Sequence, residues 1–369
     1  MDISSYRLNE RLATATVPSW RMRAMHRPHL FHTSGFPVQV DTTDELVTLL
    51  DTMQENLFGN FVKELGGLNE ADLNAFVDSL VEYCLFFRTN FPGREAPLPL
   101  STMLAHMVLA KKLRGLGPPY RILEIGPGCG YLSFFLRTWR DLEDYAQVET
   151  TESFYILQNL INKHVFRHRF RDFAPTVMAE RQAASVVTDP AGSSLQTELS
   201  ARVAVDLPPV CRHFPWWRIG DIANEKFSVV TTNATLTEFT PEALRQYIWV
   251  IDRCLALDGC MLVQCYGGGP TPLESILKSL LEIRMAPAVL VLQEEVPGAG
   301  KYFAKANFLF VRERHPLFAK FIGQPLQLPR FDSTNLMVKS VYLPDAQGTR
   351  RTVTADEIVT LVKERLKQI

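Results

Sequence analysis

The feature that most constrains the fold is the segment RILEIGPGCG at residues 121–130, in which an apolar run leads directly into a glycine-rich turn. The run has the length of a buried strand, and a helical pattern follows the turn. Gly126 and Gly128 let the chain turn tightly, and Gly130 lets the helix pack close to the strand. Such a turn directs backbone N–H groups and the positive end of a helix dipole at a polar ligand. We therefore expect a ligand site at residues 124–130.

From residue 120 onward, short apolar runs alternate with helical patterns, which is typical of a sheet built from β-α units. We expect strands at 121–125, 146–150, 227–232, 261–266, 288–292 and 307–311. We expect helices at 131–140, 154–166, 241–257 and 272–285. One further strand is expected within 167–220. The predicted fold class is α/β, with a Rossmann-like sheet that carries helices on both faces and is preceded by a helical region.

Three regions are expected along the chain. Residues 1–99 form an N-terminal arm of about 40 residues and a helical cap region, which ends at the proline-rich break PGREAPLP. Residues 100–314 form the sheet domain, with an insert at about 167–220. Residues 315–369 form a C-terminal extension that ends in an amphipathic helix at 355–366, which we expect to pack on the core. The helical region could also form a homodimer interface.

Charge and composition exclude several classes of function. The chain has 39 Lys and Arg against 40 Asp and Glu, so no global field attracts it to nucleic acid or to an anionic membrane. No window approaches the 18 apolar residues of a membrane span. The six cysteines form no CxxC pair and no cluster with zinc-ligand spacing. We expect free thiols, no metal site and a cytoplasmic location.

Two nucleotide-type ligands compete for the glycine-rich turn. The dinucleotide pattern G-x-G-x-x-G needs its third glycine at position 131, which is Tyr131. The pattern that is present is E-x-G-x-G-x-G, beginning at Glu124. An acid at this turn would repel a pyrophosphate, but it suits a ligand with a sulfonium and an ammonium group. The predicted cofactor is S-adenosylmethionine.

At these residues the chain resembles the class I S-adenosylmethionine-dependent methyltransferases, whose first motif is an acid followed by G-x-G-x-G. The resemblance covers about residues 100–312 and implies a class I methyltransferase sheet. It places the turn, including Pro127, against the methionine and ribose portions of the cofactor. It also implies an acid at the end of the second strand that binds the ribose hydroxyls, which is Glu149, with Glu152 as the alternate. An acid near the adenine amino group falls on Asp221.

Three segments resemble a bacterial group of sugar O-methyltransferases: ETTESFYILQNLINK, FPWW and TTNATLTEFTPEALRQYI. In that group a Met follows the Glu of the third segment, whereas Phe239 follows it here. The resemblance carries over placement and not substrate. It puts Asn233 and Glu238 beside the transferable methyl group. The candidate general base is Glu238, His213 or His106, and the candidate acceptor-pocket residues are Trp216, Trp217 and Tyr266.

The predicted function is methyl transfer from S-adenosylmethionine to a small polar acceptor, with an oxygen of a sugar or natural-product scaffold preferred. Three alternatives remain open: N- or C-methylation of a small metabolite, a non-catalytic S-adenosylmethionine-binding module, and a nicotinamide-dependent oxidoreductase. Metal-independent chemistry is expected, because no set of clustered carboxylates suggests a magnesium site. The expected partner is a small molecule, without nucleic acid or membrane.

Overall fold

The computed structural model of the chain describes residues 3–16, 38–50, 57–174, 210–266, 271–293, 305–321 and 349–369. Its centre is an eight-stranded sheet with the order β3-β4-β2-β1-β5-β6-β8-β7. All strands run parallel except β8, which pairs antiparallel with both neighbours. The strands are β1 (Tyr120–Ile125), β2 (Leu142–Glu149), β3 (Phe170–Asp172), β4 (Cys211–Pro215), β5 (Phe227–Asn233), β6 (Leu255–Tyr266), β7 (Ala286–Gln293) and β8 (Lys305–Val311).

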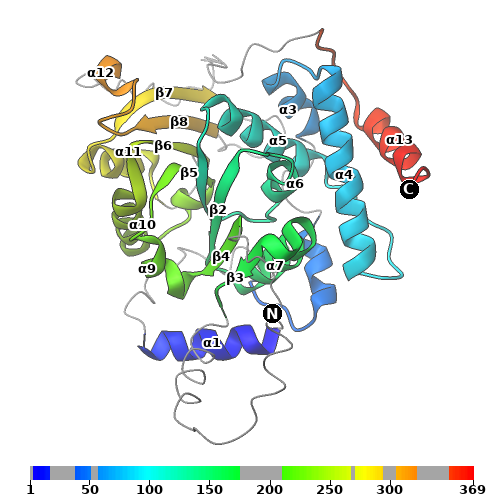
Figure 1. Cartoon of the computed structure of the whole chain (residues 1–369), viewed down its shortest axis with the longest axis horizontal. Helices are drawn as coiled ribbons and strands as arrows, with labels where there is room; N and C mark the ends of the chain where they lie inside the picture. The colour runs from blue at the N-terminus through cyan, green and yellow to red at the C-terminus, as the bar shows by residue number, and fades with distance from the viewer. Residues whose placement is uncertain are drawn as a thin grey trace, which may run out of the picture.

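Helices cover both faces of this sheet (Figure 1), which confirms the predicted α/β class. Strand side chains alternate between two hydrophobic clusters, as with Ile122 in one cluster and Leu123 in the other. The cluster with Leu123 packs under α9 (Ile219–Ile222), α10 (Pro241–Cys254) and α11 (Leu273–Glu282). The cluster with Ile122 packs under α5 (Leu100–Gly115), α6 (Leu132–Leu136) and α7 (Glu152–Phe166).

The C-terminal helix joins the N-terminal helical region. This region contains η2 (Thr43–Leu49), α3 (Phe58–Glu64) and α4 (Glu70–Asn90), and α13 (Ala355–Leu366) lies along α4 in Figure 1. Arg365 forms an ion pair with Asp78 of α4, and Leu68 pairs with Arg351 in a β-bridge. The extension also contacts the sheet, because α12 (Phe318–Phe321) lies against β7, and Ile358 and Val362 of α13 belong to the same hydrophobic cluster as Ile122. The three-region division itself stays a prediction.

Part of the predicted N-terminal arm is helical. Residues 3–16 form helix α1 (Ile3–Thr16), which contacts α7 and the short helix η4 (Trp216–Arg218). Its buried face contains polar Asn9 and Glu10 beside Tyr6 and Ala13. Because half of this face is polar, the helix lacks the hydrophobic periodicity that identifies a packed helix.

The predicted insert contains more strand than expected. Residues 175–209 lie outside the described residues, but the two flanks form β3 and β4, which pair with each other. β4 extends the sheet beyond β2, and the chain then returns to place β5 on the other side of β1. The strand order thus reverses between β1 and β5. In open α/β sheets ligands bind at such a switch point, outside the carboxyl ends of the strands.

The described helices and thiols give two further facts. Within the ranges that the structure describes, none of the helices has the length and hydrophobicity needed to cross a bilayer. Cys84, Cys211, Cys254 and Cys260 are free thiols and are buried, and Cys129 is buried with its Sγ donating a hydrogen bond to the Leu49 carbonyl. The expected cytoplasmic location stays a prediction.

Candidate functional site

The glycine-rich turn lies at the switch point, and its backbone requires glycine. Gly126, Gly128 and Gly130 all have positive φ, at 65°, 58° and 74°. A Cβ on Gly126 would lie 2.1 Å from Oγ1 of Thr235, so the turn also touches the segment that follows β5. The turn is fixed to β2 by a 2.9 Å hydrogen bond from the Gly126 N–H to the Val148 carbonyl. The structure therefore joins the ends of β1, β2 and β5.

Glu149 ends β2 and is buried beside this turn. Its Oε1 accepts hydrogen bonds from the backbone N–H groups of Thr150 (2.7 Å) and Thr151 (2.9 Å), and from the Thr151 hydroxyl (2.8 Å). Its Oε2 accepts one from Nε2 of Gln158 at 3.0 Å. Burial raises the pKa of Glu149, although each of these bonds acts in the opposite direction. The carboxylate is thus held in one orientation by the chain itself.

Glu124 lies within β1 on the same face of the sheet, and only one of its oxygens is paired. Oε2 accepts hydrogen bonds from the hydroxyl of Tyr145 and from Nε2 of Gln147, and Gln147 in turn accepts one from Asn162. Oε1 is buried and has no hydrogen-bond partner in the described part of the chain. Burial raises the pKa of Glu124 to about 7, and the negative charge of Glu149 adds to this effect. An unpaired buried oxygen of this kind is suited to a donor from a ligand.

The end of β5 supplies an amide and a third carboxyl. Nε2 of Gln264 donates a 2.7 Å hydrogen bond to Oδ1 of Asn233, so the Asn233 group that remains open is its NH₂ donor. The next residue, Ala234, has a φ of 68°, an unusual value for a residue with a Cβ. Glu238 follows on the same connection and is partly buried. Burial raises its pKa to about 8, and the charge of Glu149 contributes.

The three carboxyls form an electrostatically coupled group without a basic partner. The charge of Glu149 raises the pKa of both Glu124 and Glu238, so Glu149 interacts with each of the other two. Among the described residues, no Lys, Arg or His forms an ion pair with any of them. Nor does any set of three or more His, Cys, Asp or Glu side chains in the described ranges suit a metal ion. This end of the crevice therefore favours a ligand that brings its own positive charge.

The two candidate histidines are both buried, and His106 contacts the turn. The ring of His106, on α5, forms hydrogen bonds with the Thr102 carbonyl at 2.8 Å and with the backbone of Pro127. His106 therefore connects α5 to the glycine-rich turn. Burial lowers its pKa. His213 lies in the middle of β4 under α7, stacked on Tyr155 with ring centroids 4.0 Å apart. Burial holds its pKa well below the usual value.

Two of the predicted acids have protein partners. The carboxylate of Glu152 accepts bonds from Arg7 of α1 at 2.8 to 3.1 Å, and it is almost fully buried. The structure therefore engages Glu152 in an ion pair with the N-terminal helix. Asp221 is nearly half exposed and pairs with Arg218 at 2.6 Å on the short helix α9. Neither carboxylate is grouped with Glu124, Glu149 and Glu238.

Of the predicted acceptor-pocket aromatics, the structure describes the side chains of Trp216 and Trp217. Trp216 is fully buried, and its Nε1 donates to Glu10 of α1 at 3.0 Å. Trp217 packs on Tyr6 of the same helix, with ring centroids 5.1 Å apart. Both tryptophans thus hold α1 in place. Tyr266 is the last residue of β6, and its side chain and the loop at 267–270 lie outside the described residues.

Sequence reasoning missed two residues of this site. Gln158 of α7 donates from Nε2 to the Gly128 carbonyl at 2.6 Å as well as to Glu149. Thr235 donates from Oγ1 to the Gly126 carbonyl at 3.2 Å. Gln158 belongs to the Leu/Gln-rich segment that prompted the narrower resemblance, and Thr235 lies between Asn233 and Glu238. The sequence showed that both residues belong to motifs, but it could not show that each of them contacts the glycine-rich turn from another element.

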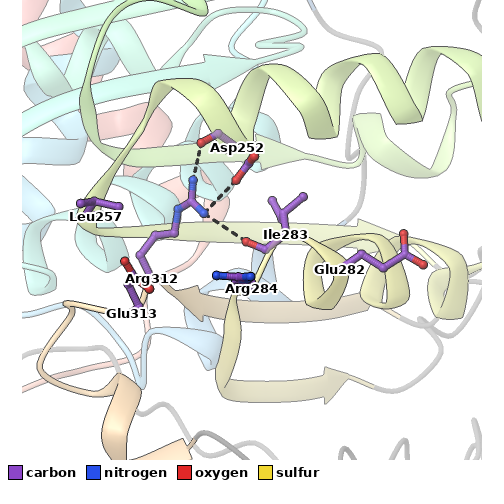
Figure 2. Close-up of a pocket in the computed structure, with 7 residues that line it drawn as sticks. All are labelled: Asp252, Leu257, Glu282, Ile283, Arg284, Arg312 and Glu313. Carbon is purple, nitrogen blue, oxygen red and sulfur yellow. Dashed lines mark hydrogen bonds and ion pairs between the residues drawn. The ribbon is translucent and has the colours of Figure 1, made fainter.

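A surface cavity of about 390 Å³ lies at the opposite edge of the sheet (Figure 2). It is bordered by the end of α10, the end of α11 and the residue after β8. Arg312 fills its base, with hydrogen bonds to the carbonyls of Asp252 and Ile283 and an ion pair with the Asp252 carboxylate at 2.9 Å. These bonds connect three elements, so the cavity is a structural junction remote from the three carboxyls.

No family model matches the chain, and no curated protein shows significant similarity to it. Solved structures resemble parts of it at low identity. The N-methyltransferase NodS from Bradyrhizobium japonicum has 12% identity and a TM-score of 0.35, covering 64% of this chain and 99% of its own. The 1,6-didemethyltoxoflavin-N1-methyltransferase of Burkholderia thailandensis has 15% identity and a TM-score of 0.34, covering 63% and 90%. A cyclopropane synthase from Mycobacterium tuberculosis has 11% identity and a TM-score of 0.37, covering 67% and 99%. The function is therefore argued from the chain's own residues.

Proposed function

We propose that the chain is an S-adenosylmethionine-dependent methyltransferase whose acceptor is a hydroxyl oxygen of a small polar molecule, such as a sugar or a natural-product scaffold. The main support for this proposal is the negative charge of the site. Glu149, beside the glycine-rich turn, acts on the pKa of both Glu124 and Glu238, and no basic side chain of the described residues pairs with these three carboxyls. A dinucleotide pyrophosphate would be repelled there, whereas a sulfonium and an ammonium group would be stabilised.

The residues at the switch point fit this cofactor. The unpaired Oε1 of Glu124 is a buried acceptor for a cationic donor. The backbone of Gly126, Gly128 and Gly130 allows close approach of a ligand. Glu149 is the acid that would bind the ribose hydroxyls. When bound, S-adenosylmethionine supplies a methyl group on a positively charged sulfur.

Two side chains at the end of β5 support an oxygen acceptor. Because Oδ1 of Asn233 is used by Gln264, its NH₂ group donates to a lone pair, which suits a hydroxyl oxygen better than a protonated amine. The ionised carboxylate of Glu238 would accept the hydroxyl proton as the methyl group passes from the sulfonium sulfur to that oxygen, and S-adenosylhomocysteine would leave as the neutral thioether. A base with a pKa of about 8 is a strong enough acceptor for this proton near neutral pH.

The test is calorimetric titration of the purified protein with S-adenosylmethionine, S-adenosylhomocysteine and NAD in parallel. We expect micromolar binding of the first two ligands and none of NAD. The affinity for S-adenosylmethionine should rise from pH 6 to pH 8, because the cation favours the ionised form of Glu124. Binding of NAD alone, or of no ligand, would reject the proposal. A tritium-transfer screen of glycosides and phenols then separates an enzyme from a binding module.

A further inference from the structure

The side chain of Gln158 connects the two parts of the proposed cofactor site. It is fully buried on α7, and its Nε2 donates to the Gly128 carbonyl and to Oε2 of Glu149, at 2.6 and 3.0 Å. The backbone carbonyl of Gly128 carries no hydrogen atom, so it can only accept. The orientation of the Gln158 amide is therefore fixed, with nitrogen toward the turn and Glu149.

The third glycine of the turn makes room for this side chain. A Cβ on Gly130 would lie 2.9 Å from Cγ of Gln158, which is closer than side chains normally approach. Gly130 also needs its positive φ of 74°. Gln158 and the turn therefore form one packed unit, and the position of Gln158 is determined by the same glycine that shapes the turn.

The other end of the amide has no partner. Oε1 of Gln158 is buried, and in the described part of the chain no group donates a hydrogen bond to it. Nearly all buried carbonyl oxygens in folded proteins are paired, so an unpaired one beside a ligand site calls for a donor from the ligand. Glu149 and Gln158 together offer neighbouring acceptors, which match the two neighbouring hydroxyl donors of a ribose diol.

We propose that Gln158 is a further cofactor-binding residue, whose Oε1 accepts a hydrogen bond from a ribose hydroxyl while its Nε2 holds Glu149 against the glycine turn. This inference rests on the proposed S-adenosylmethionine site. It assigns to α7 a direct contact with the cofactor, beside the contacts expected from the strand ends.

The experiment compares S-adenosylhomocysteine with its 2′-deoxy and 3′-deoxy analogues by calorimetry, on the full chain and on the variant Gln158→Met. Methionine keeps the length of the side chain and removes both amide groups. We expect the affinity for S-adenosylhomocysteine to fall about 10- to 100-fold, as for the loss of one or two buried hydrogen bonds. For the analogue that lacks the bonded hydroxyl, the same substitution should have at least about a fivefold smaller effect.

The matched control is Asn159→Met, which removes the neighbouring buried amide. Asn159 bonds Tyr155 and His213 and not the turn, so its loss should affect all three ligands equally. An equal loss for all three ligands in Gln158→Met would overturn the ribose contact, as would no loss at all. If wild-type protein binds none of them, the proposed function fails instead. Should Gln158→Met not fold, a crystal structure of the wild-type complex decides whether Oε1 of Gln158 lies within hydrogen-bond distance of a ribose hydroxyl.

Discussion

Replacement of Glu124 by glutamine tests the charge argument on the free protein. The variant Glu124→Gln keeps the shape of the side chain, and its Oε1 can accept from Tyr145 and Gln147 as Oε2 of the glutamate does. Its NH₂ group then takes the place of the unpaired oxygen. The substitution therefore preserves the buried network and removes only the group that ionises.

The expected effect depends on pH, and its size follows from the pKa of Glu124. This pKa is about 7 in the folded chain, against 4.5 for an unperturbed glutamate. The folded state therefore retains a proton that the unfolded state releases, and the free energy of unfolding of the wild type falls as pH rises from about 4.5 to 7. One pKa unit corresponds to about 1.4 kcal/mol, so the loss reaches about 3 kcal/mol above pH 7.

Urea unfolding at pH 5 and pH 8 measures this difference. The difference in free energy of unfolding between Glu124→Gln and wild type should be about 2 kcal/mol more favourable to the variant at pH 8 than at pH 5. Any cost of burying the new NH₂ group is the same at both pH values and cancels. The exposed Glu313→Gln serves as the control for loss of one negative charge. A gain that is equal at the two pH values would refute a buried carboxyl that titrates near 7.

Three more predictions concern the turn, the base and the N-terminal helix. Gly126→Ala brings a Cβ against Thr235 at positive φ, so it should destabilise the fold by about 2 kcal/mol and abolish calorimetric binding of S-adenosylhomocysteine. Glu238→Gln should leave that binding within about threefold and reduce turnover about 100-fold or more, while the wild-type rate should rise with pH, reach half its maximum near pH 8 and level off above about pH 9. Unchanged turnover would exclude Glu238 as the base. Arg7→Met leaves Glu152 buried without its partner and should lower the free energy of unfolding by about 1–2 kcal/mol, since Arg7 is one-third exposed.

The sequence predicted the strands best where both faces are apolar. β1 and β5 each differ by a single residue from the expected ranges. β2 begins four residues before its expected start, because Asp144 lies inside it and is buried only through its ion pair with Arg212 at 2.6 Å. In the sequence alone a charged residue such as Asp144 indicates a loop, because its partner Arg212 on β4 is not known. β6 begins at Leu255. The helical periodicity of the preceding segment predicted instead that the helix continues past this residue.

Single residues of the site are ambiguous in the sequence for the same reason, because their partners lie far away along the chain. Glu149 and Glu152 are three positions apart, and local sequence offers both as the acid that faces a ribose. Our proposal favours Glu149, because Arg7, 145 residues away from Glu152, binds the Glu152 carboxylate. In a similar way, Trp216 donates a hydrogen bond to Glu10, 206 residues away, and so contacts helix α1.

These long-range contacts have a common consequence for the proposed reaction. Helix α1 contacts Glu152, Trp216 and Trp217, all of which local sequence assigned to the ligand site. In the proposed reaction these three residues therefore have a structural role in packing the N-terminal helix. Asn233 and Glu238, which follow β5, stay the residues at which we expect methyl transfer.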